Sequence, residues 1–539
     1  MGASWNYGDI FDAVGAALPD AAPAIVHEDR CVSWGELSRR SNALAAALLE
    51  RGAKPDDKVA FYMRNCPEYL IGLVACFKAR LVHVNVNYRY LEDELVYIFD
   101  NSDAKFALVD DEFSQRVDGL RARLPGVASW LQCGPGEPAP FAESVQALSS
   151  AGDGAPLELP RSGEDLLFIY TGGTTGMPKG VMWRHEDLWG ALGWGAAMPA
   201  NAGGAPASIE AHAAAVGRHG PGPIQLPACP LMHGTGLLTA IHNLAGGGSI
   251  VTLPGHSFDP EALFEAVEQR GVQQLVIVGG AFARPMLNTL RENPGRWNLS
   301  SLQSIVSSGV MWSAEVKQGL LEQHPSMLLA DMFGSSEAVG FGSSLTSSQG
   351  GTKTARFAIG EDCRVFTEDL EPVEPGSGER GFIARRGPIP LGYYKDPEKT
   401  AKTFPTIDGV RYSVPGDWCT VAADGTLTLL GRGSVCINTA GEKVYPEEVE
   451  EVLKTHPDVE DALVVGVPDE RWGNAVTAVV QPRAGGQLDE TALRSHVRER
   501  LAGYKTPKRI LAVPRMFRAP NGKADYKGAT DFARSELGA

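Results

Sequence analysis

Apolar positions in the first part of the chain follow a helical period and a strand-like period in turn. Ser33 and Glu36 fit a capping box, and apolar residues from Leu37 to Leu48 lie on one face of a helix that should end at Gly52. Short apolar runs then alternate with helical stretches, which gives expected strands at 59–62, 81–86 and 106–109 and expected helices at 67–78 and 91–99. This order predicts an α/β fold, with parallel sheets covered by helices and ligands near the strand ends.

The same alternation returns later in the chain. Buried strands are expected at 275–278 and 305–306, further strands at 462–465 and 478–480, and a charged amphipathic helix at 490–501. A chain of 539 residues exceeds a single hydrophobic core. We therefore expect a large N-terminal domain, 1–431, in which 352–431 forms a small β subdomain, and a small α+β C-terminal domain, 432–539.

Two stretches lack a clear period. Residues 135–163 are rich in Pro, Gly, Ala and Ser and are typical of a surface connection. Residues 196–223 are rich in Ala, Gly and Pro and contain His212 and His219. No Cys or carboxylate cluster accompanies these histidines, so we expect a solvated, alanine-rich helix within a long loop rather than a metal site.

The most informative stretch is YTGGTTGMPKGVMWRHEDL, residues 170–188. An apolar, strand-like run ends at Tyr170, and the helical pattern should open at Trp183. Between them, glycines let backbone amides turn inward, while threonine hydroxyls and one lysine add donors and positive charge. The residues that supply these groups are Thr171, Gly172, Gly173, Thr174, Thr175, Gly176 and Lys179. This composition predicts a cradle for a nucleotide phosphate rather than a flexible linker.

A P-loop does not fit this stretch. The Walker A loop needs Gly directly before its Lys and Ser or Thr directly after it. Here Pro178 precedes Lys179 and Gly180 follows it. The glycines, threonines and lysine of this stretch still indicate phosphate binding, but by a loop other than a P-loop.

Charge and cysteine content limit the partners and metal sites that this protein can be expected to have. The chain has 49 Lys and Arg against 65 Asp and Glu, a net charge of −16, and no long basic run, which disfavours a nucleic-acid partner. Its 8 cysteines are dispersed without a CxxC pair, as expected for reduced thiols with no zinc site. No apolar run reaches the roughly 18 residues needed to span a bilayer, and the N-terminus lacks a signal-peptide core and a myristoylation motif. We expect a cytoplasmic protein without a stable membrane anchor.

Residues 171–180 closely resemble the signature loop T-S-G-T-T-G-x-P-K-G of the adenylate-forming acyl-CoA synthetases. Gly172 stands where that family usually has Ser, so one hydroxyl facing the phosphate is missing. The continuation through residues 181–187 is more similar to actinobacterial-type synthetases that act on fatty acids and steroid side-chain acids. The resemblance extends over essentially the whole chain, with the motifs in the family's order.

The resemblance implies an adenine and magnesium motif at 331–337. This segment, DMFGSSE, is similar to G-Y-G-x-T-E, with Phe333 in the Tyr position and Ser336 in the Thr position. Glu337 is retained, and a carboxylate facing a triphosphate is unfavourable unless a cation lies between them, so Mg²⁺ is implied there. The segment 307–310 would line the adenine site. Nucleotide binding is thereby assigned to Thr171, Gly172, Gly173, Thr174, Thr175, Lys179, Ser308, Gly309, Val310, Asp331, Met332, Phe333, Gly334, Ser335, Ser336, Asp417 and Arg432.

The C-terminal motifs are implied in the same way. Asp417 would accept hydrogen bonds from both ribose hydroxyls, and Arg432 would contact the ribose. The hinge position, usually Asp or Lys, is Ser434, a departure that could change the balance between the two domain orientations. Gly441, with Glu442 and Lys443, would border the channel of the CoA thiol. Lys523, within PNGKADY, would be the catalytic lysine that bridges the attacking carboxylate and the α-phosphate.

His233 is expected to separate an acyl pocket from the thiol channel. A lone histidine after an apolar run is otherwise a core or turn residue, and only the resemblance gives it this role. Gly234, Gly279 and Gly280 would line the acyl pocket, with 196–223 as its cover. The small residues suggest room for a bulky or long acyl group, whereas an inward Phe282, Trp312 or Trp183 would shorten the pocket.

The implied reaction has two steps and uses a small-molecule carboxylic acid, ATP with Mg²⁺, and CoA. The acid attacks ATP to give acyl-AMP and pyrophosphate, and after rotation of the C-terminal domain the CoA thiol attacks to give a thioester and AMP. Transfer to a carrier protein or an amine and a non-catalytic nucleotide-binding role stay open as alternatives, as does a homodimer.

Overall fold

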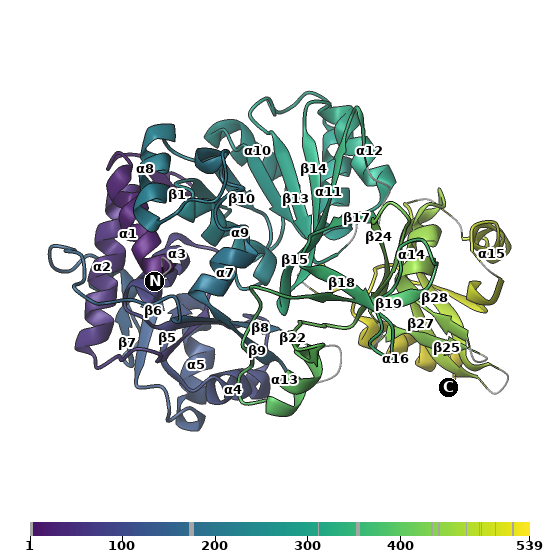
Figure 1. Cartoon of the computed structure of the whole chain (residues 1–539), viewed down its shortest axis with the longest axis horizontal. Coiled ribbons are helices and arrows are strands. Elements are labelled where there is room, and N and C mark those ends of the chain that lie inside the picture. The colour runs from purple at the N-terminus through teal and green to yellow at the C-terminus, as the bar shows by residue number, and fades with distance from the viewer. Residues whose placement is uncertain are drawn as a thin grey trace.

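The computed structural model describes residues 4–171, 177–310, 312–351, 356–432, 435–439, 442–469, 472–484, 486, 488–501, 503–519 and 522–538. Figure 1 shows a large N-terminal lobe and, at its right, a smaller lobe formed by the last part of the chain, drawn in yellow-green and yellow. The large lobe contains two sheets with helices between them and on their outer faces.

The first sheet has the strand order β20-β9-β8-β4-β3-β5-β6-β7. Its strands are β3 (Lys58–Tyr62), β4 (Val82–Asn85), β5 (Ala104–Asp110), β6 (Ser129–Cys133), β7 (Ala142–Ser144), β8 (Leu166–Thr171), β9 (Lys179–Arg184) and β20 (Gly392–Tyr393). The strands from β8 to β7 pair in parallel, whereas β9 and β20 are antiparallel. The predicted parallel α/β arrangement is confirmed in this sheet.

The second sheet has 14 strands, with the order β18-β19-β23-β24-β17-β15-β14-β13-β12-β10-β11-β1-β2 and β16 paired to β15. They are β1 (Pro23–His27), β2 (Arg30–Ser33), β10 (Ile224–Pro227), β11 (Ser249–Thr252), β12 (Gln274–Ile277), β13 (Ser304–Ser308), β14 (Leu328–Ser335), β15 (Ala338–Ser347), β16 (Gly350–Gly351), β17 (Arg356–Ile359), β18 (Cys363–Phe366), β19 (Arg380–Arg385), β23 (Asp417–Val421) and β24 (Leu427–Arg432). The parallel part ends at β14, and the strands of 352–431 continue the sheet as antiparallel neighbours.

Three layers of helices cover the two sheets. A middle layer between the sheets includes α1 (Tyr7–Ala17), α2 (Trp34–Glu50), α3 (Pro67–Lys78), α7 (His185–Ala191) and α9 (Gly234–Ala245). The outer face of the second sheet carries α10 (Pro260–Arg270), α11 (Gly280–Glu292) and α12 (Ala314–Gln323), and that of the first sheet carries α4 (Glu92–Asn101) and α5 (Ser114–Leu120). Alternation in β3 explains the layering, because Val59 and Phe61 face the middle layer while Ala60 and Tyr62 face α4.

Smaller elements complete the large lobe. They are α6 (Val145–Ser149), α8 (Ile209–His219), α13 (Pro397–Thr403), the hairpin of β21 (Thr406–Ile407) and β22 (Val410–Arg411), and the 3-10 turns η1 (Asp111–Phe113), η2 (Arg121–Arg123) and η3 (Pro199–Asn201). In the part of the chain that is described, no helix combines the length and apolar character needed to cross a bilayer. All eight cysteines are free thiols, as predicted.

The C-terminal lobe has its own sheet and core. Its elements are β25 (Ile437–Thr439), β26 (Glu442–Val444), α14 (Pro446–Lys454), β27 (Val459–Asp469), β28 (Gly473–Pro482), α15 (Glu490–Arg498), η5 (Gly503–Lys505), β29 (Arg509–Ala512) and α16 (Tyr526–Leu537). α14 and α15 pack on one face of the β27-β28-β29 sheet and α16 on the other. The expected small α+β fold is confirmed.

Three local predictions are wrong. The helix expected from Trp183 begins at His185, because residues 179–184 pair with β8 as strand β9. The connection 135–163 is not entirely irregular, since β7 extends the first sheet and α6 follows it. The helix in 196–223 exists as α8, but His212 is fully buried rather than solvated, with its ring nitrogens bonded to Asn201 and to the carbonyl of Ala245.

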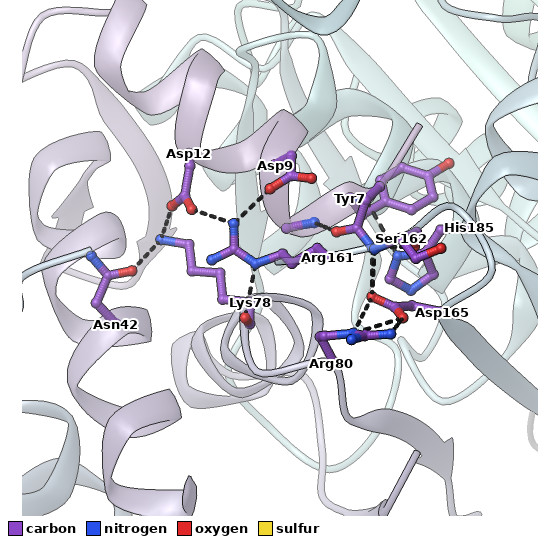
Figure 2. Close-up of polar contacts among 12 residues, drawn as sticks. Tyr7, Asp9, Asp12, Asn42, Lys78, Arg80, Arg161, Ser162, Asp165 and His185 are labelled. Carbon is purple, nitrogen blue, oxygen red and sulfur yellow. Dashed lines mark hydrogen bonds and ion pairs between the residues drawn. The ribbon is translucent and has the colours of Figure 1, made fainter. Parts of the chain in front are cut away.

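A buried polar network joins α1, α2, α3 and the segment before β8 (Figure 2). The Lys78 ammonium, 1% exposed, lies 2.8 Å from Asp12 and donates to Asn42 at 2.7 Å. Arg161 donates to Asp9 and Asp12, each at 2.8 Å, and to the Lys78 carbonyl at 2.8 Å. Burial lowers the pKa of Lys78, and the Asp12 charge opposes that effect. Asp12 therefore compensates two buried cations at once.

We expect Asp12→Ala to lower the free energy of unfolding by about 3 kcal/mol, because it leaves the buried Lys78 without its counter-ion. The measurement is the urea midpoint followed by circular dichroism. Asp93→Ala is the control, since Asp93 pairs with Arg123 at an exposed site and should change stability by about 0.5 kcal/mol or less. Equal midpoint shifts in the two variants would contradict a stabilising role for the network.

Candidate active site

The phosphate loop connects two antiparallel strands. Thr171, the last residue of β8, pairs with Lys179, the first residue of β9, so the loop is held at both ends by one ladder. The Lys179 ammonium forms an ion pair with Asp396 and lies 5.9 Å from the ring centre of Tyr393. The hydrogen bond from Lys179 holds the pKa of Asp396 below its usual value. Gly172, Gly173, Thr174 and Thr175 lie outside the described residues.

Glu337 lies in the turn between β14 and β15, close to the end of this loop. The hydroxyl of Tyr393 donates to the Glu337 carboxylate at 2.8 Å, and the Ser413 hydroxyl donates to the Glu337 carbonyl at 2.6 Å. The Trp183 indole N–H donates to the carbonyl of Ser336 at 2.9 Å. Because β20 pairs with β9, Tyr393 lies beside Lys179 while its hydroxyl bonds to Glu337. Tyr393 thereby connects the two residues.

The segments expected at the adenine site are adjacent strands. Ser308 on β13 is the register partner of Met332 on β14, and Gly309 and Val310 follow directly. Ser335 belongs to the same strand, and a Cβ added at Gly334 would lie 3.0 Å from the Ala338 carbonyl oxygen. The segments predicted at the adenine site are therefore neighbours, and the chain packs closely at Gly334.

Two side chains of the 331–337 motif are buried and make their contacts within the protein. Asp331 accepts from the Lys317 ammonium and the Trp312 indole; burial raises its pKa, against the opposing effect of Lys317. The Phe333 ring lies 5.2 Å from Phe341, centre to centre, and is 8% exposed. For Asp331 this leaves the backbone as the group available to a nucleotide.

The two residues predicted to contact the ribose belong to separate sequence motifs but lie side by side. Asp417 begins β23 and is the direct cross-strand partner of Arg432, the last residue of β24. Asp417 is 7% exposed. Ser434 and Gly441 lie outside the described residues, and Glu442 and Lys443 are placed only as backbone of β26.

Lys523 is carried by a tight loop of the C-terminal lobe that reaches the large lobe. The Lys523 carbonyl accepts from the Ala519 N–H at 2.8 Å, and Gly522 has a φ of +78°. A Cβ at Gly522 would lie only 2.7 Å from the Ala281 Cβ, so only glycine allows this approach. A Cβ at Gly309 would lie 3.8 Å from Cε of Lys523. Cε of Lys523 therefore lies beside Gly309, the residue that follows β13.

His233 lies close to the same point. It is the N-cap residue of α9, and its Nε2 is a buried atom with no hydrogen-bond partner among the described residues. Burial, followed by the charges of Lys523 and Arg89, lowers the pKa of His233 to about 3. His233 is therefore a neutral imidazole at physiological pH, with one polar atom unsatisfied beside the site.

The glycines predicted at the acyl pocket lie at the start of α9, next to this histidine, and at the junction between β12 and α11. A Cβ at Gly234 would be 3.6 Å from the Ser336 hydroxyl oxygen. Gly279 precedes α11 with a φ of +59°, and its N–H donates to the Ser307 hydroxyl at 2.9 Å. Gly280 is the first residue of α11. A Cβ at Gly309, just after β13, would lie 3.7 Å from the Thr235 hydroxyl oxygen of α9 and 3.8 Å from Val278 after β12, so the ends of the two strands meet the start of α9.

Two asparagines hold this arrangement and were missed in the sequence. The Asn85 side chain donates to the carbonyls of Tyr170, at 2.9 Å, and Met232, at 2.7 Å, and accepts from the Tyr170 N–H at 2.7 Å. Asn65 accepts from the Leu231 N–H at 2.7 Å and donates to the Cys229 carbonyl. Asn85 interrupts an apolar strand, and that signal could have identified it as a buried polar residue with a specific partner.

Tyr393 and Asp396 were also missed. They belong to the segment Gly392–Pro397, where the sequence signals only a helix start at Asp396-Pro397. Their positions beside Lys179 and Glu337 follow from the pairing of β20 with β9, across more than 200 residues of sequence. No short-range pattern reports such a contact.

Chemically, the site combines two lysines, a carboxylate and a neutral histidine around closely approaching strand ends. Such an arrangement suits a polyanion whose charge is matched by lysines and by a cation near Glu337. Among the residues that are described, no cluster of three or more His, Cys, Asp or Glu side chains could hold a metal by itself.

Comparisons with known proteins identify the family of this chain. The family model described as AMP-binding enzyme matches residues 11–394, and the AMP-binding enzyme C-terminal domain matches residues 448–523. The chain is 41% identical over 535 residues to a medium/long-chain-fatty-acid–CoA/3-oxocholest-4-en-26-oate–CoA ligase of Mycolicibacterium smegmatis, covering 98% of this chain and 96% of the relative. It is also 41% identical to a 3-oxocholest-4-en-26-oate–CoA ligase of Rhodococcus rhodochrous, covering 98% and 95%.

Solved structures agree on the fold. The anthranilate CoA ligase AuaEII in complex with anthranoyl-AMP superposes with a TM-score of 0.84 at 22% identity, with 99% of both chains covered. ATP-bound MatB from Rhodopseudomonas palustris gives a TM-score of 0.81 at 24% identity, again with 99% of both chains covered. With its two family models in order and relatives matched over nearly its full length, this chain belongs to the AMP-binding enzyme family.

Proposed function

We propose that this chain is an ATP-dependent ligase that activates a carboxylic acid as acyl-AMP and transfers the acyl group to the thiol of CoA. The observation that carries the proposal is the meeting of Lys523, from the C-terminal lobe, with the β13 end at Gly309 and with His233. A lysine placed there from a separate lobe suits a reaction between a carboxylate and a phosphate, both anionic. The names of the relatives support the same reaction class.

In the first step, the residues of this chain bind and orient the reactants. Lys179 and the amides of its loop would contact the phosphates, with Lys179 exchanging Asp396 for the nucleotide. Asp417 and Arg432, paired across β23 and β24, would hold the ribose. Lys523 would bridge the carboxylate of the acid and the α-phosphate as charge accumulates between them.

Glu337 fits the part of a magnesium ligand. The Tyr393 hydroxyl donates to one carboxylate oxygen, which orients the carboxylate and leaves its other lone pairs for a cation. Mg²⁺ commonly uses one or two carboxylates together with substrate phosphates, and when bound it would neutralise charge on the triphosphate. Glu337 would hold it beside Lys179.

The second step needs the thiol to reach the acyl-AMP. We infer that the C-terminal lobe rotates about residues near 432–434, withdraws Lys523, and brings the segment around Gly441 to the site. His233, which stays neutral, would separate the acyl group from the thiol path. Residues 1–431 and 432–539 would then be the two domains that move relative to each other. Free cysteine thiols and the CoA thiol both require a reducing environment.

For the acid, we propose a medium- or long-chain fatty acid or a steroid side-chain acid. The support is 41% identity over nearly the whole chain to ligases named for these acids. An amine or a carrier protein as acceptor is the second candidate. An amide bond synthetase, McbA from Marinactinospora thermotolerans, shares the fold with a TM-score of 0.80 at 24% identity, which shows that the fold alone does not choose the acceptor.

The proposal is tested by ATP–pyrophosphate exchange without CoA, over a panel of short, medium, long, aromatic and steroid side-chain acids. We expect exchange with the fatty and steroid acids, and thioester formation once CoA is added. Exchange followed by transfer to an amine or a carrier protein, but not to CoA, would replace the proposed acceptor. No exchange with any acid, from protein that binds ATP, would refute the proposed ligase.

Lys523→Ala should lower the rate of adenylate formation roughly 100- to 1,000-fold, because charge between the two anions is no longer neutralised. Thioester formation from supplied acyl-AMP should change little. Lys527→Ala, an exposed lysine at the start of α16, is the matched control and should affect neither step. Equal losses in both steps would contradict the division of roles.

Glu337→Gln should raise the Mg²⁺ concentration needed for half-maximal pyrophosphate exchange by about tenfold, because an amide oxygen is a weaker ligand than a carboxylate. The measurement is a magnesium titration at saturating acid. Glu361→Gln, at an exposed position of the same lobe, serves as the control. An unchanged titration midpoint in Glu337→Gln would exclude Glu337 as the magnesium ligand.

A further inference from the structure

Four charged residues of alternating sign meet where the two lobes touch. Arg284 on α11 and Glu315 on α12 belong to the large lobe, while Glu460 on β27 and Arg483, just after β28, belong to the C-terminal lobe. One Arg483 nitrogen lies 2.9 Å from both carboxylate oxygens of Glu315, and Arg284 lies 3.5 Å from Glu460. The remaining sides, Arg284 to Glu315 and Arg483 to Glu460, measure 3.8 and 4.0 Å. We call this group the interlobe ring.

The interlobe ring is partly buried. The exposed fractions of its side chains run from 14% for Arg284 to 36% for Glu315. A cavity of about 150 Å³ lies beside it, lined by Arg284 and Glu460 together with charged residues of both signs. Ion pairs at such a depth are screened less than surface pairs, but they remain sensitive to salt.

A short chain of contacts runs from the ring to Lys523. Glu460 stands at a bulge in β27, where the register with β28 shifts, and Asp461 follows it. Asp461 accepts two hydrogen bonds from Arg518, at 2.5 and 2.7 Å, and Arg518 donates to the carbonyl of Gly522 at 3.1 Å. The ring is therefore fixed to the loop that holds Lys523.

The Asp461–Arg518 pair is well formed. Its side chains are 20% and 17% exposed. Burial alone would raise the pKa of Asp461, but the hydrogen bonds from Arg518 bring it below its usual value. The pair ties Gly522, the residue before Lys523, to β27.

One helix of the large lobe, α11, contacts both the loop that carries Lys523 and the interlobe ring. Ala281, in the first turn of α11, is the residue that Gly522 approaches, and Arg284 lies three positions further on, on the same helix. A displacement of the C-terminal lobe that breaks the ring would therefore also move Gly522 away from Ala281.

We propose that Arg284, Glu315, Glu460 and Arg483 are positioning residues that hold the C-terminal lobe in the orientation in which Lys523 reaches the adenylation site. This inference rests on the function proposed above for Lys523. The ring residues contact no reactant. They affect the reaction only by fixing the orientation of the C-terminal lobe. It is needed for acyl-AMP formation, where Lys523 is used, and not for thioester formation from acyl-AMP.

The test uses Glu315→Gln and Arg483→Gln, alone and together, in the full chain. Each single variant should slow pyrophosphate exchange about five- to tenfold, since loss of one partly buried pair shifts a two-state equilibrium by about that factor. The double variant should lose less than the product of the two single losses, because both substitutions remove the Arg483–Glu315 pair, the shortest side of the ring. The rate of thioester formation from supplied acyl-AMP should stay within about twofold of wild type.

Glu143→Gln is the matched control. Glu143 forms a two-bond pair with Arg51, at 2.7 and 2.5 Å, entirely within the large lobe. This variant should retain the exchange rate of the wild type. Raising salt from about 50 mM to about 500 mM should slow exchange more in the wild type than in Glu315→Gln, where the ring is already broken.

A second measurement does not require catalysis. Small-angle X-ray scattering of Glu315→Gln should show a larger radius of gyration than that of the wild type, with Glu143→Gln unchanged. If the wild type shows no exchange with any acid but this shift occurs, the ring still holds the lobe and the proposed ligase function fails instead. The inference is overturned if Glu315→Gln leaves both exchange and scattering unchanged, or if it slows both half-reactions equally.

Discussion

The candidate site depends on one buried side chain amide. Asn85 satisfies the backbone on both sides of it, at Tyr170 before the phosphate loop and at Met232 before His233. Without this amide, two carbonyls and one N–H would be buried without partners at the point where the first sheet meets the middle layer. The loop predicted to bind phosphate and the histidine predicted beside the acyl pocket are therefore both tied to this side chain.

A second constraint is that the site is assembled from segments distant in sequence. β20 crosses from the antiparallel region to pair with β9, and thereby brings Tyr393 to Glu337. The Lys523 loop arrives from a separate lobe and is seated by the fit of Gly522 on Ala281. The positive charge that the anionic reactants require is thus concentrated locally in a chain of net charge −16.

Periodicity predicted most of the fold, because strands such as β3 to β5 are short apolar runs bounded by turns, and helices such as α2 carry their own caps. It failed at Trp183, where pairing with β8 overrides the local helical pattern. It also missed the burial of His212, since α8 is covered through contacts with α1 that no window of sequence contains. Motif wording identified Lys179, Glu337, Asp417 and Lys523 as candidates, whereas Asn85, Tyr393 and Asp396 depend on long-range pairing and carry no motif.

In this structure the Lys179 ammonium is already paired with the carboxylate of Asp396. An incoming anion must displace a carboxylate that is already bonded, so weakly charged anions such as chloride gain little by entering. Under the proposed function, a triphosphate, which brings several charges and its own cation, would exchange places with Asp396. The aspartate would then compete with incoming anions for Lys179, admit only highly charged ones, and pair with Lys179 again when the product leaves.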